Sequence, residues 1–526
     1  MKIVINNIKM PIGHNTDDVI AAAREIVRSD CVSAQNFQIY KQSIDARRKN
    51  NIHYVYSVVA DCDKAVNSKN ISVLSNNSSF SVPKVNLGTR PVVIGMGPCG
   101  LFAAYILALS GNPPIIIERG GDVDSRTESV ARFWKTGILD TNSNVQFGEG
   151  GAGTFSDGKL NTRIGDPRQK FVLETFTKFG APEEILYKAK PHIGTDLLCD
   201  VIRNMRRELI ALGAEVRFNS TVTGFDIQNN RICGVEINHS EKISCSKVIL
   251  AIGHSSRDTY SVLNNLGIDL TPKAFAVGVR IEHSQDFINR LQYGGAEGLP
   301  PADYRVVYNG KERSCYSFCM CPGGTVVNAS SEEELLAVNG MSYHKRDGKN
   351  ANSALVVTVN PGDFSKDVLG GVDFQRKYER LAFKLGGSDN KIPMQLAEDF
   401  AKNIPSVQLK EVIPTATSGF ALAELKNCLP SFVTETLTEG LADFENRMPG
   451  FSSGGAVLSG IESRTSAPLR ILRDESLQST TVKGLYPSGE GAGYAGGIVS
   501  AAVDGIRSAL AMIDSLIYSK HMEVIL

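Results

Sequence analysis

Two closely spaced cysteines are the first residues of this sequence whose types and spacing could carry out chemistry. Cys319 and Cys321 are separated only by Met320 in FCMCPGG. Such a pair can store two electrons by cycling between a dithiol and a disulfide. The alternative is structural, because alternate strand residues share a side and Cys-Pro-Gly-Gly is typical of a strand entering a turn. The sequence leaves both possibilities open.

A histidine and a glutamate–arginine pair are candidates for proton transfer and anion binding. His192, in KPHIGTD, is a candidate general acid or base because imidazole titrates near neutral pH. A hydrogen-bonded structural histidine is the alternative. Glu462 and Arg464, in IESRTSAP, could position an anionic substrate or form a structural salt bridge. The candidate catalytic residues are therefore His192, Cys319, Cys321 and Arg464.

Residues 90–118, RPVVIGMGPCGLFAAYILALSGNPPIIIE, have the pattern of a dinucleotide-binding unit that could supply a redox cofactor. Pro91 to Ile94 is a short apolar run typical of a buried parallel strand. Gly95, Gly97 and Gly100 follow with GxGxxG spacing. They are expected to form the tight turn, to admit a diphosphate, and to let helix and strand pack closely.

The segments after these glycines complete the pattern. A helix from Pro98 to Leu109 would direct its N-terminal N–H groups at the diphosphate. Ile115 to Ile117 is expected to form the second parallel strand, and Glu118 follows it 18 residues after Gly100. A carboxylate at this position binds the hydroxyls of an adenosine ribose and repels a 2′-phosphate. The unit therefore favours FAD or NAD over NADP.

Three later segments are expected to approach the same cofactor. Gln146 to Leu160 holds five glycines whose backbone could lie flat against a ring or phosphate, the alternative being a flexible loop. Lys247 to Ala251 is an apolar strand that leads to Gly253. Gly484 to Ala511 repeats the order of strand, glycine turn and helix. The predicted cofactor-binding residues are Gly95, Gly97, Pro98, Cys99, Gly100, Glu118, Arg119, Arg126, Gly150, Gly151, Gly153, Thr154, Ser156, Asp157, Lys159, Gly253, Gly489, Glu490, Gly491, Ala492, Gly493, Gly497 and Ile498.

Composition excludes several classes of protein. Basic and acidic residues number 56 each, so the chain has no net charge and no global field for nucleic acid or an anionic membrane. No signal-peptide core and no apolar run near the ~18 residues of a membrane span is present. We expect a cytoplasmic protein with no membrane partner, and ten cysteines that are free thiols. No HxH, HExxH or paired CxxC spacing indicates a metal site.

The glycine turn that ends in Glu118, the KVILAIGH strand and the GLYPSGEGAGYAGG segment together resemble the FAD-binding domain of the glutathione-reductase-like flavoprotein superfamily, in its branch with a single nucleotide domain. Glu490 matches the acid that binds the ribityl chain or diphosphate there, where the family usually has Asp. The chain also resembles a bacterial family of uncharacterised FAD-dependent dehydrogenases, through KQSIDARRKN (41–50), GGAGTFSDGKLNTR (150–163), KPHIGTD (190–196), CMCPGG (319–324) and ESRTSAPLRILRD (462–474). This resemblance implies noncovalent FAD, a ferredoxin-like N-terminal domain and a C-terminal substrate domain.

These observations predict an α/β protein with a discontinuous Rossmann-like FAD-binding domain. Residues 1–88 form the ferredoxin-like domain, with strands at Lys2–Pro11, Gln38–Ser43 and His53–Ala60, a helix at Thr16–Val27, and a loop or linker at Asn67–Ser81. Residues 89–270 and 479–526 form the FAD-binding domain, with a helix at Asp196–Leu212 and strands at Glu215–Phe218, Val222–Gln228 and Arg231–Ile237. Residues 271–478 form an α+β substrate domain.

The predicted function is an FAD-dependent oxidoreductase that transfers a hydride between the flavin and an unidentified small-molecule substrate. The flavin ring is expected near Gly150 to Lys159 and the Gly491 turn. NAD(P)H would visit only transiently, or the substrate itself would reduce the flavin. One alternative is an RNA-modifying flavoprotein that docks RNA through residues 1–88, where Arg47, Arg48 and Lys49 form either a basic patch or a solvated turn. Another is a sensor that binds FAD without turnover. The sequence does not determine the oligomeric state.

Overall fold

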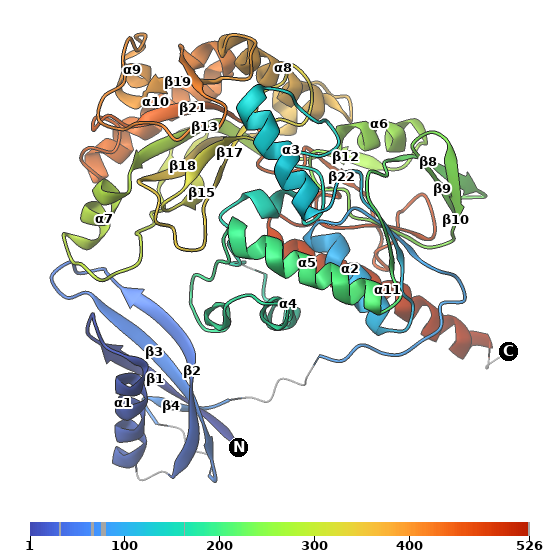
Figure 1. Cartoon of the computed structure of the whole chain (residues 1–526), viewed down its shortest axis with the longest axis horizontal. Helices are drawn as coiled ribbons and strands as arrows, with labels where there is room; N and C mark the ends of the chain where they lie inside the picture. Colours follow the sequence, from blue (N-terminus) through green and yellow to red (C-terminus); the bar gives the residue numbers. More distant parts are fainter. Residues whose placement is uncertain (31–32, 65–67, 75–79, 163, 524–526) are drawn as a thin grey trace.

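Three sheets with separate apolar cores form most of the molecule (Figure 1). The computed structural model describes residues 1–30, 33–64, 68–74, 80–162 and 164–523, and the side chains up to residue 515. In Figure 1 the N-terminal unit lies at the lower left, the parallel sheet and its helices on the right, and the third part at the top.

The N-terminal unit is a four-stranded antiparallel sheet with one helix. Its strands have the order β2-β3-β1-β4. The helix α1 is capped by Asn15, which forms a reciprocal capping box with Asp18. The elements are β1 (Lys2–Met10), α1 (Thr16–Ser29), β2 (Ala34–Asp45), β3 (His53–Cys62) and β4 (Ile71–Val73). The predicted βαββ order is confirmed.

The stretch predicted as a loop or linker, Asn67–Ser81, contains an additional strand. β4 pairs with Ile3 to Ile5, and Ile71 is buried in the apolar core. The prediction was wrong for Ile71–Val73. The Ser- and Asn-rich composition around this strand is typical of a loop, and Ile71 is the residue of the strand that is buried in the core. Residues 67 and 75–79 of the stretch lie outside the described residues.

The N-terminal unit is hydrogen-bonded to the next part of the chain through β2. The Gln42 N–H donates to Tyr187 O at 2.8 Å, and the Ala189 N–H donates to Gln42 O at 2.8 Å. In the neighbouring basic stretch, Arg47 Nε donates to Asp45 Oδ1 at 2.9 Å. Arg47 is therefore paired with Asp45, which weakens the interpretation of Arg47, Arg48 and Lys49 as a basic patch.

Five parallel strands form the central sheet, in the order β23-β11-β5-β6-β7. The strands are β5 (Val92–Ile94), β6 (Ile115–Ile117), β7 (Glu215–Arg217), β11 (Val248–Leu250) and β23 (Leu485–Pro487). The last strand enters the sheet from far along the chain, because its Leu485 to Pro487 pair with Val248 to Leu250. The predicted assembly of a parallel sheet from distant segments is thus confirmed.

Helices cover one face of this sheet and a small antiparallel sheet packs near the other. α2 (Pro98–Leu109), α4 (Arg168–Lys178), α5 (Thr195–Ala211) and α11 (Ile498–Glu523) contribute to one apolar core. Figure 1 shows α2, α5 and α11 next to one another. The second core contains β8 (Val222–Gln228), β9 (Arg231–Ile237), β10 (Glu241–Ser244) and α6 (Arg257–Asn265). Asn229 and Asn230 have φ of 50° and 58°, as their predicted hairpin turn requires.

A seven-stranded sheet and its helices form the third part. The strand order is β14-β15-β18-β13-β21-β19-β20, and only β19 and β20 run parallel. The strands are β13 (Phe275–Ser284), β14 (Val307–Asn309), β15 (Ser314–Cys321), β18 (Asn350–Val359), β19 (Ile392–Leu396), β20 (Phe420–Leu422) and β21 (Val457–Glu462). The helices are α7 (Gln285–Tyr293), α8 (Gly370–Leu385), α9 (Ala397–Lys402) and α10 (Ser431–Arg447). This composition agrees with the predicted α+β class.

The remaining elements connect these parts. They are α3 (Val123–Thr136), the two-stranded pair β12 (Leu270–Pro272) and β22 (Leu469–Ile471), and the pair β16 (Thr325–Asn328) and β17 (Val338–Met341).

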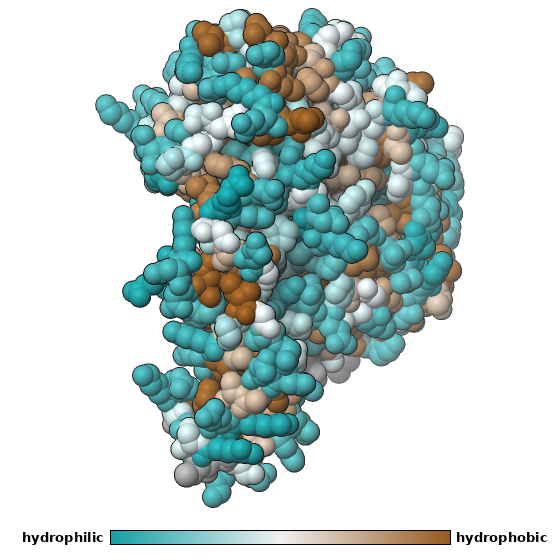
Figure 2. All heavy atoms as spheres, turned by 60° about the vertical axis from the view of Figure 1, so that its left-hand side comes forward, coloured by the Kyte–Doolittle hydropathy of each residue, from teal (hydrophilic) through white to brown (hydrophobic). Residues whose placement is uncertain are grey.

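Figure 2 shows a mainly hydrophilic face interrupted by separate apolar patches. Among the described residues, no helix is both long enough and apolar enough to cross a bilayer.

Candidate functional site

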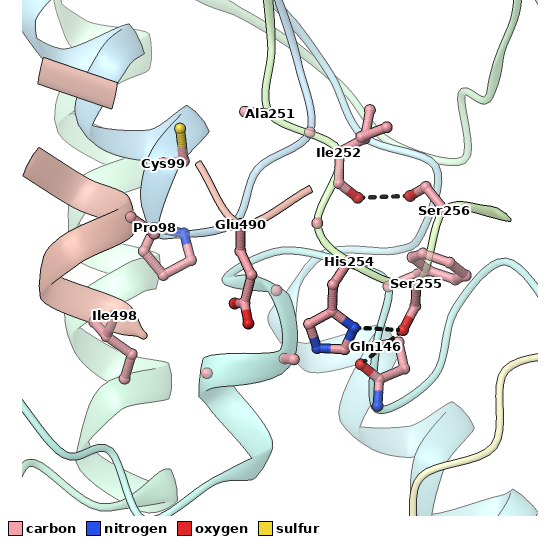
Figure 3. Close-up of a pocket in the computed structure, with 18 of the residues that line it drawn as sticks. Pro98, Cys99, Gln146, Ala251, Ile252, His254, Ser255, Ser256, Glu490 and Ile498 are labelled. Carbon is pink, nitrogen blue, oxygen red and sulfur yellow. Dashed lines mark hydrogen bonds between the residues drawn. The ribbon is translucent and has the colours of Figure 1, made fainter. Parts of the chain in front are cut away.

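A cavity of about 360 Å³ lies at the carboxyl ends of the central parallel strands. This is the place where open α/β sheets bind their ligands. Its wall is built by segments that are far apart in sequence, namely 94–99, 117–119, 146–161, 251–256, 318–319, 462–465 and 490–501. Figure 3 shows side chains from several of these segments directed into the cavity.

The glycine turn after β5 can exist only with glycine at two of its positions. A Cβ on Gly95 would lie 2.3 Å from Ala251 O, and a Cβ on Gly100 would lie 1.9 Å from Gly95 O. Gly97 is the N-cap of α2, and no side chain caps this helix end. A Cβ on Gly97 would meet nothing closer than Gly151 Cα at 3.6 Å. The helix end is therefore exposed to the cavity, as diphosphate binding requires.

Glu118 holds the backbone of three segments together at one end of the cavity. Its Oε2 accepts a hydrogen bond from Met96 N at 2.7 Å, and its Oε1 accepts from Gly120 N at 3.0 Å and Gly148 N at 2.9 Å. A carboxylate offers about four acceptor positions, so one stays available for a ribose hydroxyl. The sequence predicted the ligand contact but not this structural role.

Arg119 and Arg126, both predicted to contact the cofactor, have different positions. Arg119 lines the cavity and its guanidinium lies 4.2 Å from the centre of the Phe147 ring. Arg126 is fully buried outside the lining, where it donates to Asn144 O at 2.8 Å and Val145 O at 2.8 Å. Burial lowers its pKa to about 10. Arg126 therefore supports the glycine segment from behind.

The glycine-dense segment contributes one wall of the cavity. Its lining members among the predicted residues are Gly151, Gly153, Ser156, Asp157 and Lys159, whereas Gly150 and Thr154 lie outside the lining. Asp157 is buried and accepts a hydrogen bond from Arg346 Nε at 2.9 Å. Burial alone would raise the pKa of Asp157, but Lys159 and Arg346 outweigh it and lower that pKa. Lys159 Nζ lies 3.6 Å from Asp157 Oδ2 and has no hydrogen-bond partner among the described residues.

The turn before α11 places one carboxylate in the cavity. Glu490 points into it in Figure 3, and burial raises its pKa to about 7. Gly253, Gly497 and Ile498 also line the cavity. The predicted residues outside the lining here are Gly489, Gly491, Ala492 and Gly493, and Gly100 in α2 is likewise outside it. Two of them anchor the turn, since Gly489 N donates to Asp504 Oδ2 at 2.7 Å and Gly491 O accepts from Tyr260 OH at 2.8 Å.

His254 is a lining residue that sequence reasoning missed. Its Nδ1 lies 3.0 Å from Ser255 Oγ, and this hydroxyl donates to Gln146 Oε1 at 3.3 Å (Figure 3). Burial, assisted by Arg464 and Arg257, lowers the pKa of His254 to about 3. The imidazole is therefore neutral at physiological pH. Its place directly after a buried strand and a glycine was the available signal.

His192 lies outside the cavity lining. Its Nε2 is 2.9 Å from His344 O, and a carbonyl oxygen only accepts, so Nε2 carries a proton. Burial and Arg346 lower the pKa of His192 to about 4. This geometry favours the structural alternative, and the acid–base role stays a prediction.

His192→Gln is expected to make the protein less sensitive to acid. The folded pKa is about 4 and the ordinary value is 6.5, so protons favour the unfolded state as pH falls from 6.5 to 4. Removing this group should flatten the loss of stability in that window by on the order of 3 kcal/mol. Urea unfolding at several pH values would measure the effect. The matched control is the exposed His239→Gln, and equal slopes for wild type and His192→Gln would contradict the expectation.

The two cysteines of FCMCPGG differ in position. Cys319 lines the cavity with a φ of 45°, a left-handed conformation uncommon outside glycine, and the β15–β18 pairing shifts register between Phe318 and Cys321. Cys321 is buried, and its thiol donates to Cys319 O at 3.3 Å. The neighbouring Cys321, together with Lys159 and Arg280, lowers the pKa of the Cys319 thiol. The pair thus interrupts the regular strand.

Arg464 lines the cavity as part of a buried ion network. Its Nε and Nη2 donate to the Glu379 carboxylate at 3.1 Å and 2.8 Å. Arg257 binds the same carboxylate at 2.9 Å and 2.7 Å. The predicted salt-bridge alternative is therefore present, with Glu379 as the partner.

Among the described residues, no cluster of His, Cys, Asp and Glu is arranged to hold a metal ion, and the described cysteines are free thiols.

Two protein-family models and one related protein match this chain. Residues 274–465 match the family described as "FAD-dependent protein, C-terminal domain-like", and residues 1–61 match a domain of unknown function. An uncharacterized protein of Clostridium beijerinckii is 50% identical over 97% of this chain and 98% of its own. The chain belongs to the same family as this Clostridium beijerinckii protein, and its residues 274–465 belong to the FAD-dependent C-terminal domain family. Its cofactor is FAD.

Solved structures of other FAD proteins show a weaker likeness to this FAD-dependent protein. CtdE in complex with FAD is 13% identical, covers 81% of this chain and 84% of its own, and has a TM-score of 0.32. Glycerol-3-phosphate dehydrogenase of Bacillus halodurans, complexed with FAD, is 13% identical over 81% of this chain and 65% of its own, with a TM-score of 0.36.

The cavity of the FAD-dependent protein fits its cofactor. The uncapped end of α2, the side-chain-free wall at Gly97 and Gly151, and the remaining acceptor position of Glu118 suit a diphosphate and an adenosine ribose. Membership of the wider glutathione-reductase-like superfamily stays a prediction.

Proposed function

We propose that the protein is an oxidoreductase that exchanges a hydride between FAD and a small-molecule substrate. The observation that carries this proposal is the composition of the cavity wall. One part of the wall holds the diphosphate-binding features around Gly97 and Glu118, and another holds groups that can exchange protons or electrons, including Cys319 and Glu462. When bound, FAD supplies the hydride chemistry, and the protein supplies orientation and electrostatics.

The proposal places the flavin ring beside the seven-stranded sheet. Phe318 and Cys319 on β15 and Glu462 on β21 belong to this sheet, and Asn339 lies on β17 of the two-stranded sheet. All four residues line the cavity. Glu118 binds the adenosine ribose, and the α2 end binds the diphosphate. The ring then extends toward these β-strand residues, where a substrate is held and water is excluded. With one dinucleotide fingerprint in full context, NAD(P)H binds only transiently or the substrate itself reduces the flavin.

The test of this function is the spectrum of the purified protein followed by anaerobic reduction. We expect a yellow protein whose visible absorption is bleached by a metabolite or nicotinamide donor and returns when an acceptor is added. A colourless protein that does not bind FAD on reconstitution overturns the proposal. Bound flavin that no donor reduces and no acceptor reoxidises would instead favour the FAD-binding sensor.

We propose that Cys319 is the reactive thiol of this site, and we expect it to be alkylated before Cys321. Cys319 faces the cavity beside Lys159, whereas Cys321 is buried. Iodoacetamide labelling of the purified protein across pH, read by peptide mass spectrometry, should give a midpoint below that of an ordinary thiol. Removal of FAD should speed the labelling because the bound cofactor covers the cavity wall.

Lys159→Met supplies the matched comparison for this thiol. Loss of the cation should raise the labelling midpoint of Cys319 by about one pH unit, whereas the exposed Lys84→Met should not change it. Equal labelling of Cys319 and Cys321, or a midpoint that Lys159→Met leaves unchanged, contradicts the assignment.

A further inference from the structure

Glu462 has one carboxylate oxygen without a hydrogen-bond partner in the part of the chain that the structure describes. It lies at the end of β21, its side chain is almost completely buried, and it lines the cavity. Its Oε2 is buried and has no hydrogen-bond partner among the described residues. Buried polar atoms are nearly always paired, so an unpaired oxygen on the wall of a ligand cavity indicates a group that binds a ligand atom.

Arg280 of β13 is the cation nearest to this carboxylate. Its Nε lies 3.5 Å from Glu462 Oε2, which is an ion-pair distance, and Nε also has no hydrogen-bond partner within the described parts of the chain. Arg280 is held in place because its Nη2 donates to Cys319 O at 2.9 Å. A shift of about 0.7 Å would convert this loose pair into a charge-assisted hydrogen bond of about 2.8 Å. The pair can therefore accommodate Glu462 in both its neutral and its ionised form.

The packing around Arg280 preserves room for this arrangement. A Cβ on Gly340 would lie 2.3 Å from Arg280 Nη1, so only glycine fits beside the guanidinium. The charged and titratable groups of this region are Arg280 on β13, Cys319 and Cys321 on β15, Asp157 and Lys159 on the glycine-dense segment, Tyr304 before β14, Arg464 after β21 and Glu490 on the turn before α11. Burial raises the pKa of Glu462 to about 7. Arg280 opposes this rise and Cys319 adds to it.

We propose that Glu462 is the catalytic acid–base residue of the flavin reaction, and that Arg280 positions it and stabilises its ionised form. This inference rests on the proposed function. It defines the substrate class as a compound with a polarised C=O, C=N or conjugated C=C bond, or the corresponding alcohol, amine or saturated compound. Such substrates need a proton donor or acceptor beside the carbon that exchanges the hydride.

In the reducing direction, the substrate gains one hydride and one proton. The substrate carbon gains a hydride, which is two electrons and one proton, from the reduced cofactor. The substrate heteroatom, or the α-carbon of a conjugated C=C bond, gains the proton that leaves the Glu462 carboxyl group. The carboxylate that remains is paired with Arg280 and regains a proton from water. The oxidising direction reverses each transfer, with Glu462 accepting the proton.

The test measures the midpoint potential of the bound flavin against pH, and needs no substrate. Negative charge placed on the flavin by reduction raises the proton affinity of a nearby Glu462. Above pH 7 the wild type should therefore take up one more proton for each two electrons than Glu462→Gln does. This makes the wild-type slope steeper by up to about 30 mV per pH unit for a two-electron couple. Below pH 7 the two slopes should be equal because Glu462 is already protonated.

Glu282→Gln is the matched control. Glu282, on β13, is also a buried carboxylate, and burial raises its pKa to about 6. Unlike Glu462, it accepts hydrogen bonds from Asn350 and Thr415 and lies outside the cavity lining. Its variant should keep the wild-type slope. A yellow Glu462→Gln protein with the wild-type slope overturns the inference while leaving the proposed function intact, whereas a colourless wild type overturns the function itself.

A second measurement covers the case in which Glu462→Gln does not fold. The reduced-minus-oxidised infrared difference spectrum of the wild type near pH 8 should contain a band of a protonated carboxyl group that shifts in D2O. Glu462→Asp should keep this band at a shifted frequency, and Glu282→Gln should keep it unchanged. Absence of a protonated carboxyl band in the wild type overturns the inference.

Discussion

Gly100→Ala is expected to yield a protein without bound FAD. The added Cβ would lie 1.9 Å from Gly95 O and 2.9 Å from Gly95 C. Both atoms belong to the backbone of the turn, so no side chain can move aside. Helix α2 must shift away from β5, which displaces the helix end that faces the diphosphate. Overpacking of this kind costs about 3 kcal/mol of the free energy of unfolding, and the FAD content per protein should fall to a small fraction.

Gly362→Ala is the control for this substitution, since a Cβ at Gly362 meets no atom within 4 Å. It should retain the wild-type ratio of visible to ultraviolet absorbance and the wild-type unfolding midpoint. The expectation would be refuted by a Gly100→Ala protein that folds and retains a full complement of FAD. Such a result would mean that the close approach of α2 and the β5 turn does not decide cofactor binding.

Glu379→Gln should cause the largest loss of stability among isosteric substitutions near the cavity. Glu379 is fully buried and its carboxylate is shared by Arg257 and Arg464, whose side chains are also buried. Ser463 Oγ donates to it as well, at 2.6 Å. The amide keeps the shape but removes the charge, so two guanidinium groups remain buried without their common counterion. Breaking a buried ion pair in this way costs about 3–5 kcal/mol, measurable by chemical denaturation.

The pH dependence of this loss has a defined sign. Burial alone would raise the pKa of Glu379, but Arg257 and Arg464 hold it well below its ordinary value. The stabilisation is therefore complete above the unfolded pKa of about 4.3 and is lost as the pH falls further. The difference between wild type and Glu379→Gln should be constant from about pH 6 to 8 and shrink in acid. Glu332→Gln is the matched control, because Glu332 binds Arg257 from a partly exposed position and should cost about 1 kcal/mol. Equal losses for the two variants would contradict the interpretation.

The sequence by itself determined the cofactor-binding unit and the elements around it. The apolar run at Pro91–Ile94, the glycines and Glu118 correspond to β5, the turn and the end of β6, because these features arise from local backbone requirements that residue types reveal directly. The same holds for the Asn229–Asn230 turn, whose left-handed backbone favours asparagine. Strand β4 was missed because a single buried isoleucine, Ile71, gives no periodic signal.

Only the tertiary structure decided which polar residues meet in the cavity. His192 and Arg464 looked equally suitable as candidates, yet His192 donates to a backbone carbonyl outside the lining and Arg464 is bound by Glu379. Conversely, His254 and the unpaired Glu462 gained their importance from elements far apart in sequence. Whether a titratable side chain is paired, buried or open depends on partners that lie 85 to 182 residues away in these cases. No local pattern encodes those partners, because the long-range packing of three sheets brings them together.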